Sequence, residues 1–131
     1  MDGELEQLVW TRAAGRCEYC HLPSELAAAP FQIDHVASQK HGGLTVAENL
    51  ALSCFYCNSY KGPDVAGIDP VSGRIVRLFH PRRHHWTDHF QWNGPLLVGK
   101  TAIGRATIQV LWINHPAAVE VRKLAAEYFT D

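Results

Sequence analysis

The chain has 131 residues, of which 47% are apolar and 19% are charged, and its formal net charge at pH 7 is −1. This length and composition are typical of one domain that buries a core, and they exclude a low-complexity chain. No apolar run approaches the ~18 residues needed to cross a bilayer, so we expect no membrane partner. Residues 1–7 carry three acidic residues and no basic one, which is not typical of a secretory signal, and we expect a cytoplasmic protein.

The first third of the chain predicts two helical segments and a strand. Residues 5–14 have the spacing of a short amphipathic helix that ends at Gly15. A Cys-x-x-Cys pair follows, and the alanine-rich residues 25–30 favour a partial helix. Residues 31–35 alternate apolar and polar side chains, as a half-buried strand does.

The second strand and a short helix come next. Gly42-Gly43 indicates a loop, and residues 50–53 predict a strand that returns beside the first. A helix is expected at residues 57–61, where Gly62 and the proline after it limit its length.

The rest of the chain predicts one strand, one hairpin and two helices. The strand is at residues 74–79, and Asn93-Gly94 is a turn signal between strands at 89–92 and 96–98. The helices run from 101 to about 112 and from 116 to about 129, with Pro116 in the first turn of the last one. The sequence therefore predicts an α+β fold in one domain, 1–131, whose C-terminal helices either cover the strands or form a homodimer interface.

The four cysteines form two Cys-x-x-Cys pairs, Cys17 with Cys20 and Cys54 with Cys57. Two residues between thiolates let both sulfur atoms face one tetrahedral ion at ~2.3 Å, and two such pairs complete a closed site. The 33 residues between the pairs exceed the ~15–20 of a compact four-cysteine finger, so the insert holds a structural element of its own. We predict one structural zinc ion, with a dithiol redox pair or unrelated buried thiols as alternatives.

Further polar and glycine residues stand at fixed spacings around the cysteine pairs. In chain order they are Asp34-His35, Gly42-Gly43, Asn49-Leu50, Asn58 and Lys61. Together with the cysteines, this order and spacing resemble the zinc-stapled HNH endonucleases over about residues 12–62. The resemblance implies a ββα-metal finger (HNH or His-Me finger): two strands joined by the glycine loop, then a helix. Residues 63–131 would be a β and helical extension of the same domain.

The resemblance also implies the roles of four residues. The first His of the family signature corresponds to His35, its Asn to Asn49, and its third position, often His, to Asn58. An imidazole with a pKa near ~6.5 suits a general base that takes a proton from water. Oxygen atoms of Asp34 and Asn58 suit one Mg²⁺ or Mn²⁺ ion, and Asn49 would fix the loop and orient the imidazole. Consecutive strand residues face opposite ways, so Asp34 and His35 converge only if the strand ends or bulges there.

The activity that the resemblance implies is hydrolysis of DNA phosphodiester bonds, giving 5′-phosphate and 3′-hydroxyl ends. The alternative is a non-catalytic, zinc-containing module that binds nucleic acid or protein. Lys61 is a candidate for contact with a phosphate oxygen, and His41 is expected to be an ordinary loop residue.

Basic residues concentrate in one segment of the second half. Residues 72–105 hold a single acid, Asp88, against six bases and four histidines: Arg74, Arg77, Arg82, Arg83, Lys100 and Arg105, and His80, His84, His85 and His89. Such asymmetry suits either a face turned toward a polyanion or a solvated basic surface. From this segment Arg82, Arg83 and His89 are predicted to contact substrate. The aromatic residues Trp86, Phe90 and Trp92 either stack on bases or belong to the core.

Overall fold

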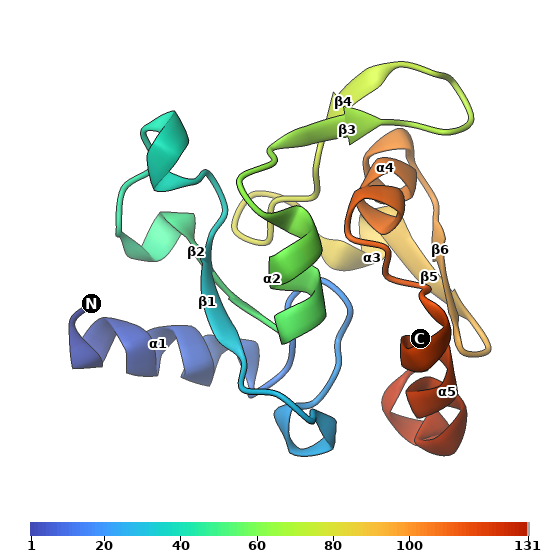
Figure 1. Ribbon diagram of the computed structural model, residues 1–131, viewed down its shortest axis with the longest axis horizontal. Helices are drawn as coiled ribbons and strands as arrows, with labels where there is room; N and C mark the ends of the chain where they lie inside the picture. Colours follow the sequence, from blue (N-terminus) through green and yellow to red (C-terminus); the bar gives the residue numbers. More distant parts are fainter. Residues whose placement is uncertain (131) are drawn as a thin grey trace.

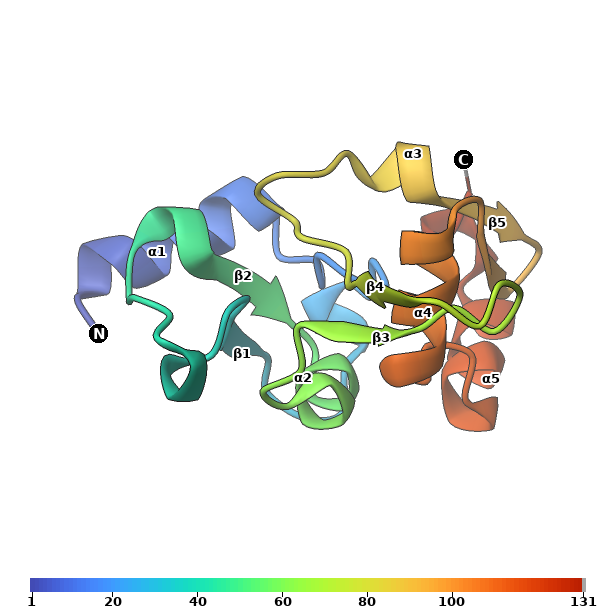
Figure 2. The same cartoon turned by 90° about the horizontal axis from the view of Figure 1, so that it is seen from above.

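The structure, a computed structural model, describes residues 1–130. Its first half contains α1 (Gly3–Ala13), β1 (Gln32–His35), β2 (Leu50–Ser53) and α2 (Phe55–Lys61). The second half contains β3 (Ala66–Ile68), β4 (Ile75–Arg77), α3 (Trp86–His89), β5 (Phe90–Asn93), β6 (Leu96–Gly99), α4 (Ala102–Val110) and α5 (Pro116–Leu124). The strands form three antiparallel pairs, β1–β2, β3–β4 and β5–β6, and α2 lies between the first pair and the C-terminal elements (Figures 1 and 2). The predicted α+β fold is confirmed.

Helix α1 begins and ends close to the predicted positions. The Asp2 side chain caps its N-terminus by accepting a hydrogen bond from the Glu4 N–H. Val9 on its inner face is fully buried and packs with Leu50 of β2. The chain leaves the helix one residue before the predicted stop, because Ala14 already adopts a left-handed φ of 53°.

The ββα unit forms because each element is fixed by a local signal. Strands β1 and β2 pair without a bulge, with Asp34 opposite Ala51 and His35 opposite Leu50. Helix α2 starts two residues earlier than predicted, because the Sγ of Cys54 caps it by accepting from the Cys57 N–H. The predicted finger is therefore present, with its helix anchored directly on the second cysteine pair.

Three features of the structure differ from the sequence predictions. The alanine-rich segment contains only a 3₁₀ turn at Ser24–Leu26, so the predicted partial helix is largely absent. The predicted strand at 74–79 is shorter than expected and pairs with an unpredicted strand, β3. The predicted hairpin, β5–β6, is preceded by an unpredicted single-turn helix, α3. The last helix ends at Leu124, and a separate 3₁₀ turn at Ala126–Tyr128 follows it.

The two halves of the chain share one hydrophobic core. It runs from the four cysteines and Tyr19 through Phe79 and Phe90 to the C-terminal residues Leu111 and Ile113. Helix α4 turns its buried residues toward β6 and the β3–β4 pair, so the predicted homodimer through the C-terminal helices receives no support. In the described part of the chain no helix combines the length and the apolar character that a membrane span requires.

The aromatic residues around α3 and β5 are part of this core. Phe90 is buried, Trp86 donates its indole N–H to the Tyr19 carbonyl at 2.9 Å, and the rings of Trp86 and His21 stack at 3.8 Å. Trp92 packs edge-on against Phe129 at 5.3 Å. The prediction that these three aromatic residues belong to the core is confirmed, because their rings pack against other residues of the protein.

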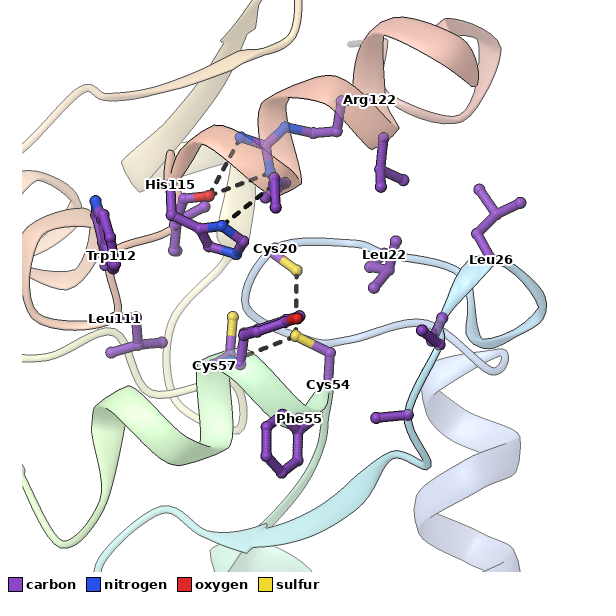
Figure 3. A pocket seen from close by; sticks show the side chains of 18 of the residues that line it. Cys20, Leu22, Leu26, Cys54, Phe55, Cys57, Leu111, Trp112, His115 and Arg122 are labelled. Carbon is purple, nitrogen blue, oxygen red and sulfur yellow. Dashed lines mark hydrogen bonds between the residues drawn. The ribbon is translucent and has the colours of Figure 1, made fainter.

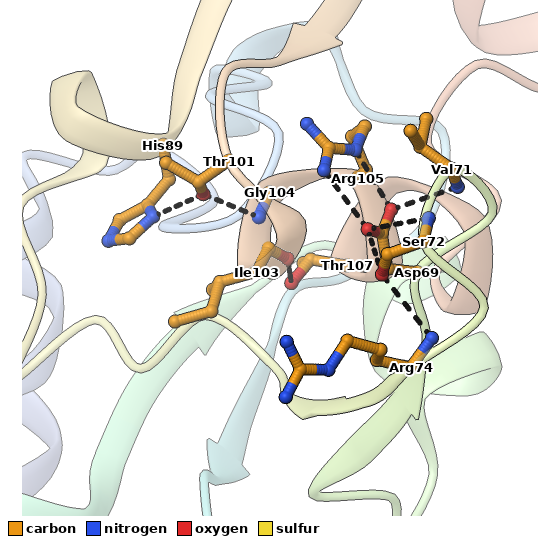
Figure 4. A network of polar contacts seen from close by, with 10 residues as sticks. All are labelled: Asp69, Val71, Ser72, Arg74, His89, Thr101, Ile103, Gly104, Arg105 and Thr107. Carbon is orange, nitrogen blue, oxygen red and sulfur yellow. Dashed lines mark hydrogen bonds and ion pairs between the residues drawn. The ribbon is translucent and has the colours of Figure 1, made fainter.

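Asp69 ties the β3–β4 hairpin to α4 (Figure 4). Its buried carboxylate accepts a bidentate pair of hydrogen bonds from Arg105 at 2.8 and 3.0 Å. It also accepts from the Ser72 hydroxyl at 2.7 Å and from the N–H groups of Val71 and Ser72. These donors, Arg105 first and Ser72 second, hold the pKa of Asp69 well below its ordinary value.

Replacing Asp69 by asparagine is expected to lower the melting temperature at pH 7, because the carboxylate loses its charge opposite Arg105. Since the folded-state pKa is depressed, the stability that Asp69 contributes is fully present above the unfolded pKa of ~3.9 and is lost as the pH falls below it. The variant should therefore also lose less stability than wild type on acidification. Thermal unfolding followed by circular dichroism at several pH values measures both effects. Asp64→Asn, at an exposed position near the hairpin, is the matched control, and equal melting temperatures for the two variants would contradict the prediction.

Candidate metal centre and active site

The four cysteine sulfur atoms form one buried cluster. Their Sγ atoms all lie within 4.8 Å of one another, and those of Cys20 and Cys54 are 3.8 Å apart. A tetrahedral ion with Zn–S bonds of ~2.3 Å requires sulfur separations of ~3.8 Å, so the donor set fits zinc. In each pair the second N–H points at the first sulfur: Cys20 N to Cys17 Sγ at 3.5 Å and Cys57 N to Cys54 Sγ at 3.4 Å. These four thiols are free, and they are clustered as a structural zinc site requires.

An apolar cavity of ≈ 160 Å³ separates this cluster from the C-terminal helix α5. Cys20, Cys54 and Cys57 line one side of it, with His115 and Arg122 on the other (Figure 3). The guanidinium of Arg122 is buried and donates to the carbonyls of Pro95 and Ile113. Burial lowers the pKa of Arg122, whereas the nearby thiols act to raise it. Arg122 therefore places a positive charge near the cluster, a role that no motif in the sequence indicates.

Asp34 lies in β1 between the first cysteine pair and α2. Its side chain is 5% exposed, accepts a hydrogen bond from the Tyr19 hydroxyl at 2.7 Å and forms an ion pair with Lys61 at 3.2 Å. Burial raises the pKa of Asp34, while the Lys61 ammonium and the Tyr19 hydroxyl act in the opposite direction. The adjacent His35 acts in the same direction as Lys61, but burial outweighs these effects and the pKa of Asp34 stays above its ordinary value.

Lys61 was expected to be exposed to a phosphate group, but its side chain is buried and paired. It is 1% exposed, and its Nζ donates to the carbonyl of Val36 at 3.0 Å in addition to the Asp34 contact. A buried ammonium with these partners is not available to a phosphate group, so the predicted substrate contact of Lys61 does not fit the structure. Lys61 instead holds Asp34 and the end of β1 against α2. Asn58 lies three residues earlier on the same face of α2 and is half-buried.

His35 is the last residue of β1 and is half-exposed. The strand ends at His35, and its pairing with β2 is regular up to that residue, so a convergence of His35 with Asp34 remains a prediction. The Nε2 atom of His35 lies 2.9 Å from the Thr45 hydroxyl, in the loop that connects the two strands. The imidazole thus has one fixed partner and remains accessible from outside the finger.

Asn49 holds this connecting loop in place. Its Oδ1 accepts from the Ala37 N–H at 2.8 Å, and its Nδ2 donates to the carbonyls of Ala37 and Leu44, both at 2.9 Å. Gly43 packs so closely against Ala37 that an added Cβ would lie 1.7 Å from the Ala37 oxygen. Asn49 and Gly43 therefore both hold the loop against Ala37, and together they fix the position of the loop that carries Thr45.

The predicted substrate residues of the second half lie in different surroundings. Arg82 is largely buried and forms an ion pair with Glu18, so its predicted contact with a phosphate does not fit the structure. Arg83 is exposed, as a substrate contact requires. His89 packs against Phe79 with ring centroids 6.0 Å apart, and its Nδ1 contacts the Thr101 hydroxyl. His41 is an exposed residue of the 3₁₀ turn Gln39–His41.

Comparison with known proteins points to the same segment. Residues 17–64 match the family model described as HNH endonuclease. No curated protein and no solved structure matches the chain. The matched segment begins at Cys17 and includes β1, β2 and α2, which are the elements that carry the cysteine cluster and the Asp34–His35 pair. Residues 17–64 are therefore similar in sequence to the HNH endonucleases, and the four clustered cysteines lie within this matched segment.

Proposed function

We propose that the protein is a metal-dependent endonuclease that hydrolyses DNA phosphodiester bonds. The observation that carries this proposal is the position of His35 and Asp34 at the end of β1, inside the segment that matches the HNH family. The family is one of nucleases, and the zinc-type cluster beside this strand supplies a rigid support for such a site. The products would carry 5′-phosphate and 3′-hydroxyl ends. The cytoplasmic location and the limits of the domain remain predictions.

In this proposal His35 is the general base. Its ring accepts a proton from a water molecule that attacks the phosphorus atom, and Thr45 holds the ring in orientation through Nε2. Nδ1 is then the atom left to receive the proton, which requires the tautomer with hydrogen on Nε2 and Thr45 as acceptor. Asn49 supports this arrangement indirectly, because its three hydrogen bonds fix the loop that carries Thr45.

Asp34 and Asn58 are the proposed ligands of a divalent cation, Mg²⁺ or Mn²⁺. Their carboxylate and amide oxygen atoms suit a hard cation. Asn58 lies one turn before Lys61 in α2, and Lys61 pairs with Asp34. A cation bound there would polarise the phosphate and stabilise the charge that develops on its oxygen atoms. The Tyr19 hydroxyl donates a hydrogen bond to the same carboxylate and orients it.

The direct test is cleavage of supercoiled plasmid and of single-stranded DNA by the purified protein with Mg²⁺, Mn²⁺ or Ni²⁺. We expect nicked or linear products with at least one of these ions, and none in the presence of a chelator. The absence of products with all three ions would refute the enzymatic proposal. A crystal soaked with Mn²⁺ should show anomalous density between Asp34 and Asn58, away from the cysteines.

A second candidate function is a non-catalytic, zinc-containing nucleic-acid-binding module. The burial of Asp34 and its ion pair with Lys61 favour it, because a carboxylate engaged in this way offers fewer lone pairs to a cation. Mn²⁺ titration monitored by electron paramagnetic resonance separates the two functions. Stoichiometric binding that is lost in Asp34→Asn supports the nuclease, and DNA binding without any bound Mn²⁺ supports the module. Stoichiometric zinc that survives dialysis, with no reversible disulfide, would rule out a redox protein.

Replacing Tyr19 by phenylalanine is expected to reduce cleavage and Mn²⁺ affinity by about 10–100-fold, as is typical when a partner of a metal ligand is removed. The change deletes the 2.7 Å hydrogen bond to Asp34 and keeps the packing of the ring against Phe79. The measurements are the cleavage rate as a function of Mn²⁺ concentration and the zinc content. Tyr56→Phe, at an exposed position in α2, is the control. Unchanged Mn²⁺ dependence in Tyr19→Phe would show that the hydroxyl has only a structural role.

A further inference from the structure

The arginines of the second half fall into two groups. Arg82, Arg105 and Arg122 are engaged by Glu18, Asp69 and backbone carbonyls. Among residues 1–130, the side chains of Arg74, Arg77 and Arg83 form neither ion pairs nor hydrogen bonds, and all three are exposed. Free guanidinium groups are therefore restricted to the β3–β4 hairpin and the segment that follows it.

Two histidines beside these free arginines present N–H donors. The Nδ1 of His80 accepts from the Arg82 N–H at 3.2 Å, and the Nδ1 of His84 accepts from the His80 N–H at 2.9 Å. In a neutral imidazole an accepting Nδ1 places the ring hydrogen on Nε2. Each ring therefore carries an Nε2–H donor that has no partner within the described chain. The His80 side chain is 7% exposed and lines a small cavity, in contrast to Lys61 and Arg82, whose donors are engaged by other groups. Such a pair is unsuited to a metal ion, which needs a free lone pair on nitrogen.

His89 extends the same arrangement. Its Nδ1 lies 2.6 Å from the Thr101 hydroxyl, which also accepts from the Gly104 N–H (Figure 4). The Thr101 hydroxyl can then donate to Nδ1, which again leaves hydrogen on Nε2. The His89 ring lies 5.2 Å from that of His84, and both pack around Phe79.

The charges around these rings are almost all positive. Burial lowers the pKa of His80 to about 4, and the guanidinium groups of Arg83 and Arg77 act in the same direction. The pKa of His84 is lowered by burial and then by His89, Arg77 and Arg83. The acids in this region are Asp88, beside His89, Asp64, which lines the neighbouring cavity, and Glu18, which is paired with Arg82. Positive charges held together in this way favour an anion with several acceptor oxygen atoms.

This group of side chains adjoins the candidate active site. A small cavity is lined by Arg77 and His80 from the second half and by Val36, Ala37 and Lys61 from the finger. Val36 follows His35 directly, and Lys61 contacts the carbonyls of both residues. Phe79 packs edge-on against Tyr19, whose hydroxyl binds Asp34. An anion at the arginines therefore lies next to the end of β1.

We propose that Arg77, His80, Arg83 and His84, named here the basic cluster, bind a backbone phosphate of nucleic acid beside the scissile bond. The inference rests on the proposed function for its choice of nucleic acid among polyanions. Arg77 and Arg83 supply charge and forked N–H groups, and the two imidazoles supply single Nε2–H donors. Contacts of this kind fix the position of the backbone without reading base sequence.

The test is DNA binding in the His35→Ala background, which separates binding from cleavage. A fluorescently labelled duplex is titrated at several salt concentrations, and Kd is obtained from anisotropy. Arg77→Gln and Arg83→Gln are each expected to weaken binding roughly tenfold at ~0.1 M salt and to reduce the slope of log K against log salt by about 1. Arg74→Gln, an equally exposed arginine of the same hairpin, is the matched control and should change neither value.

The outcomes distinguish the basic cluster from the proposed activity. Weakened binding by Arg77→Gln and Arg83→Gln but not by Arg74→Gln supports the phosphate site, even if wild type cleaves no DNA. Equal behaviour of all three variants, or no salt-dependent DNA binding by the parent, overturns it, even if wild type cleaves DNA. Zinc content and melting temperature check folding, and they should be unchanged because both arginines are exposed and unpaired.

Discussion

The replacement His35→Ala is expected to reduce DNA cleavage by about 10²–10⁴-fold, the range attributed to a positioned general base. The imidazole is the titratable group at the exposed end of β1, and Asp34 beside it is buried and paired. Without the ring, the attacking water has no acceptor for its proton at neutral pH. Substrate binding should be nearly unchanged, because the basic cluster supplies contacts that do not involve His35.

The structure indicates that this variant keeps its fold. The His35 side chain is half-exposed, and its hydrogen bond to Thr45 is at the surface. Zinc content and melting temperature should therefore match wild type, and the loss should be in kcat and not in KM. His41→Ala, which removes an exposed imidazole from the same loop region, is the control and should cleave normally. A His35→Ala protein with wild-type kcat would assign the general base to another residue.

The finger was predictable from sequence because each of its signature residues has a local requirement. Cys54 has to cap α2 and join the four-sulfur cluster, Gly43 has to pass against Ala37, and Asn49 has to close the loop. Requirements of this kind involve residues that lie close together in the chain. They therefore appear in the sequence as fixed spacings, and the family match to residues 17–64 follows the same spacings.

The partners of long charged side chains were not predictable in the same way. Lys61 and Arg82 were both expected at phosphate groups, yet they pair with Asp34 and Glu18. Glu18 lies 64 positions before Arg82, and only the folded chain brings the two together. Composition shows that a segment is basic, but it does not show which of its cations are already neutralised.

Short elements were missed for an energetic reason. α3 is a single turn, Trp86–His89, and β3 has three residues, so neither is long enough to show a period. The alanine-rich residues 25–30 illustrate the reverse case, since helix propensity there is high. A helix of this length is marginal without an apolar face packed on the core, and the chain forms one 3₁₀ turn instead.

Removal of the zinc ion is expected to unfold the protein. Structural zinc sites contribute about 10–16 kcal/mol, which is of the same size as the ~5–15 kcal/mol stability of a typical domain. All four cysteines are buried in the core shared by the two halves. Removal of the zinc ion would therefore leave four thiols in this core with no metal to hold them together. Circular dichroism of chelator-treated protein should show loss of the thermal transition. A stripped protein that keeps its melting temperature within a few degrees would contradict the prediction.

The same experiment separates the two metals. Activity lost through chelation should not return with Mg²⁺ alone, because the fold is missing, and should return when Zn²⁺ is supplied before Mg²⁺. A weaker chelator that removes only Mg²⁺ gives the contrasting result, with activity lost and the melting temperature kept. Cys54→Ser should reproduce the zinc-free state, since it removes one ligand and alters the cap of α2.

Specific contacts connect the cysteine cluster to the proposed cation ligands, so that zinc removal is expected to disturb the active site. Tyr19 lies inside the first cysteine pair and holds the Asp34 carboxylate, and Asn58 directly follows Cys57 of the second pair. Asp34 is therefore linked to the first cysteine pair through Tyr19, and Asn58 is bonded directly to Cys57. Co²⁺ in place of zinc keeps four-cysteine coordination and gives thiolate absorption bands that report it. If cobalt-loaded protein shows these bands, melts normally and still cleaves DNA, then the cluster acts through the geometry it imposes on Tyr19 and Asn58.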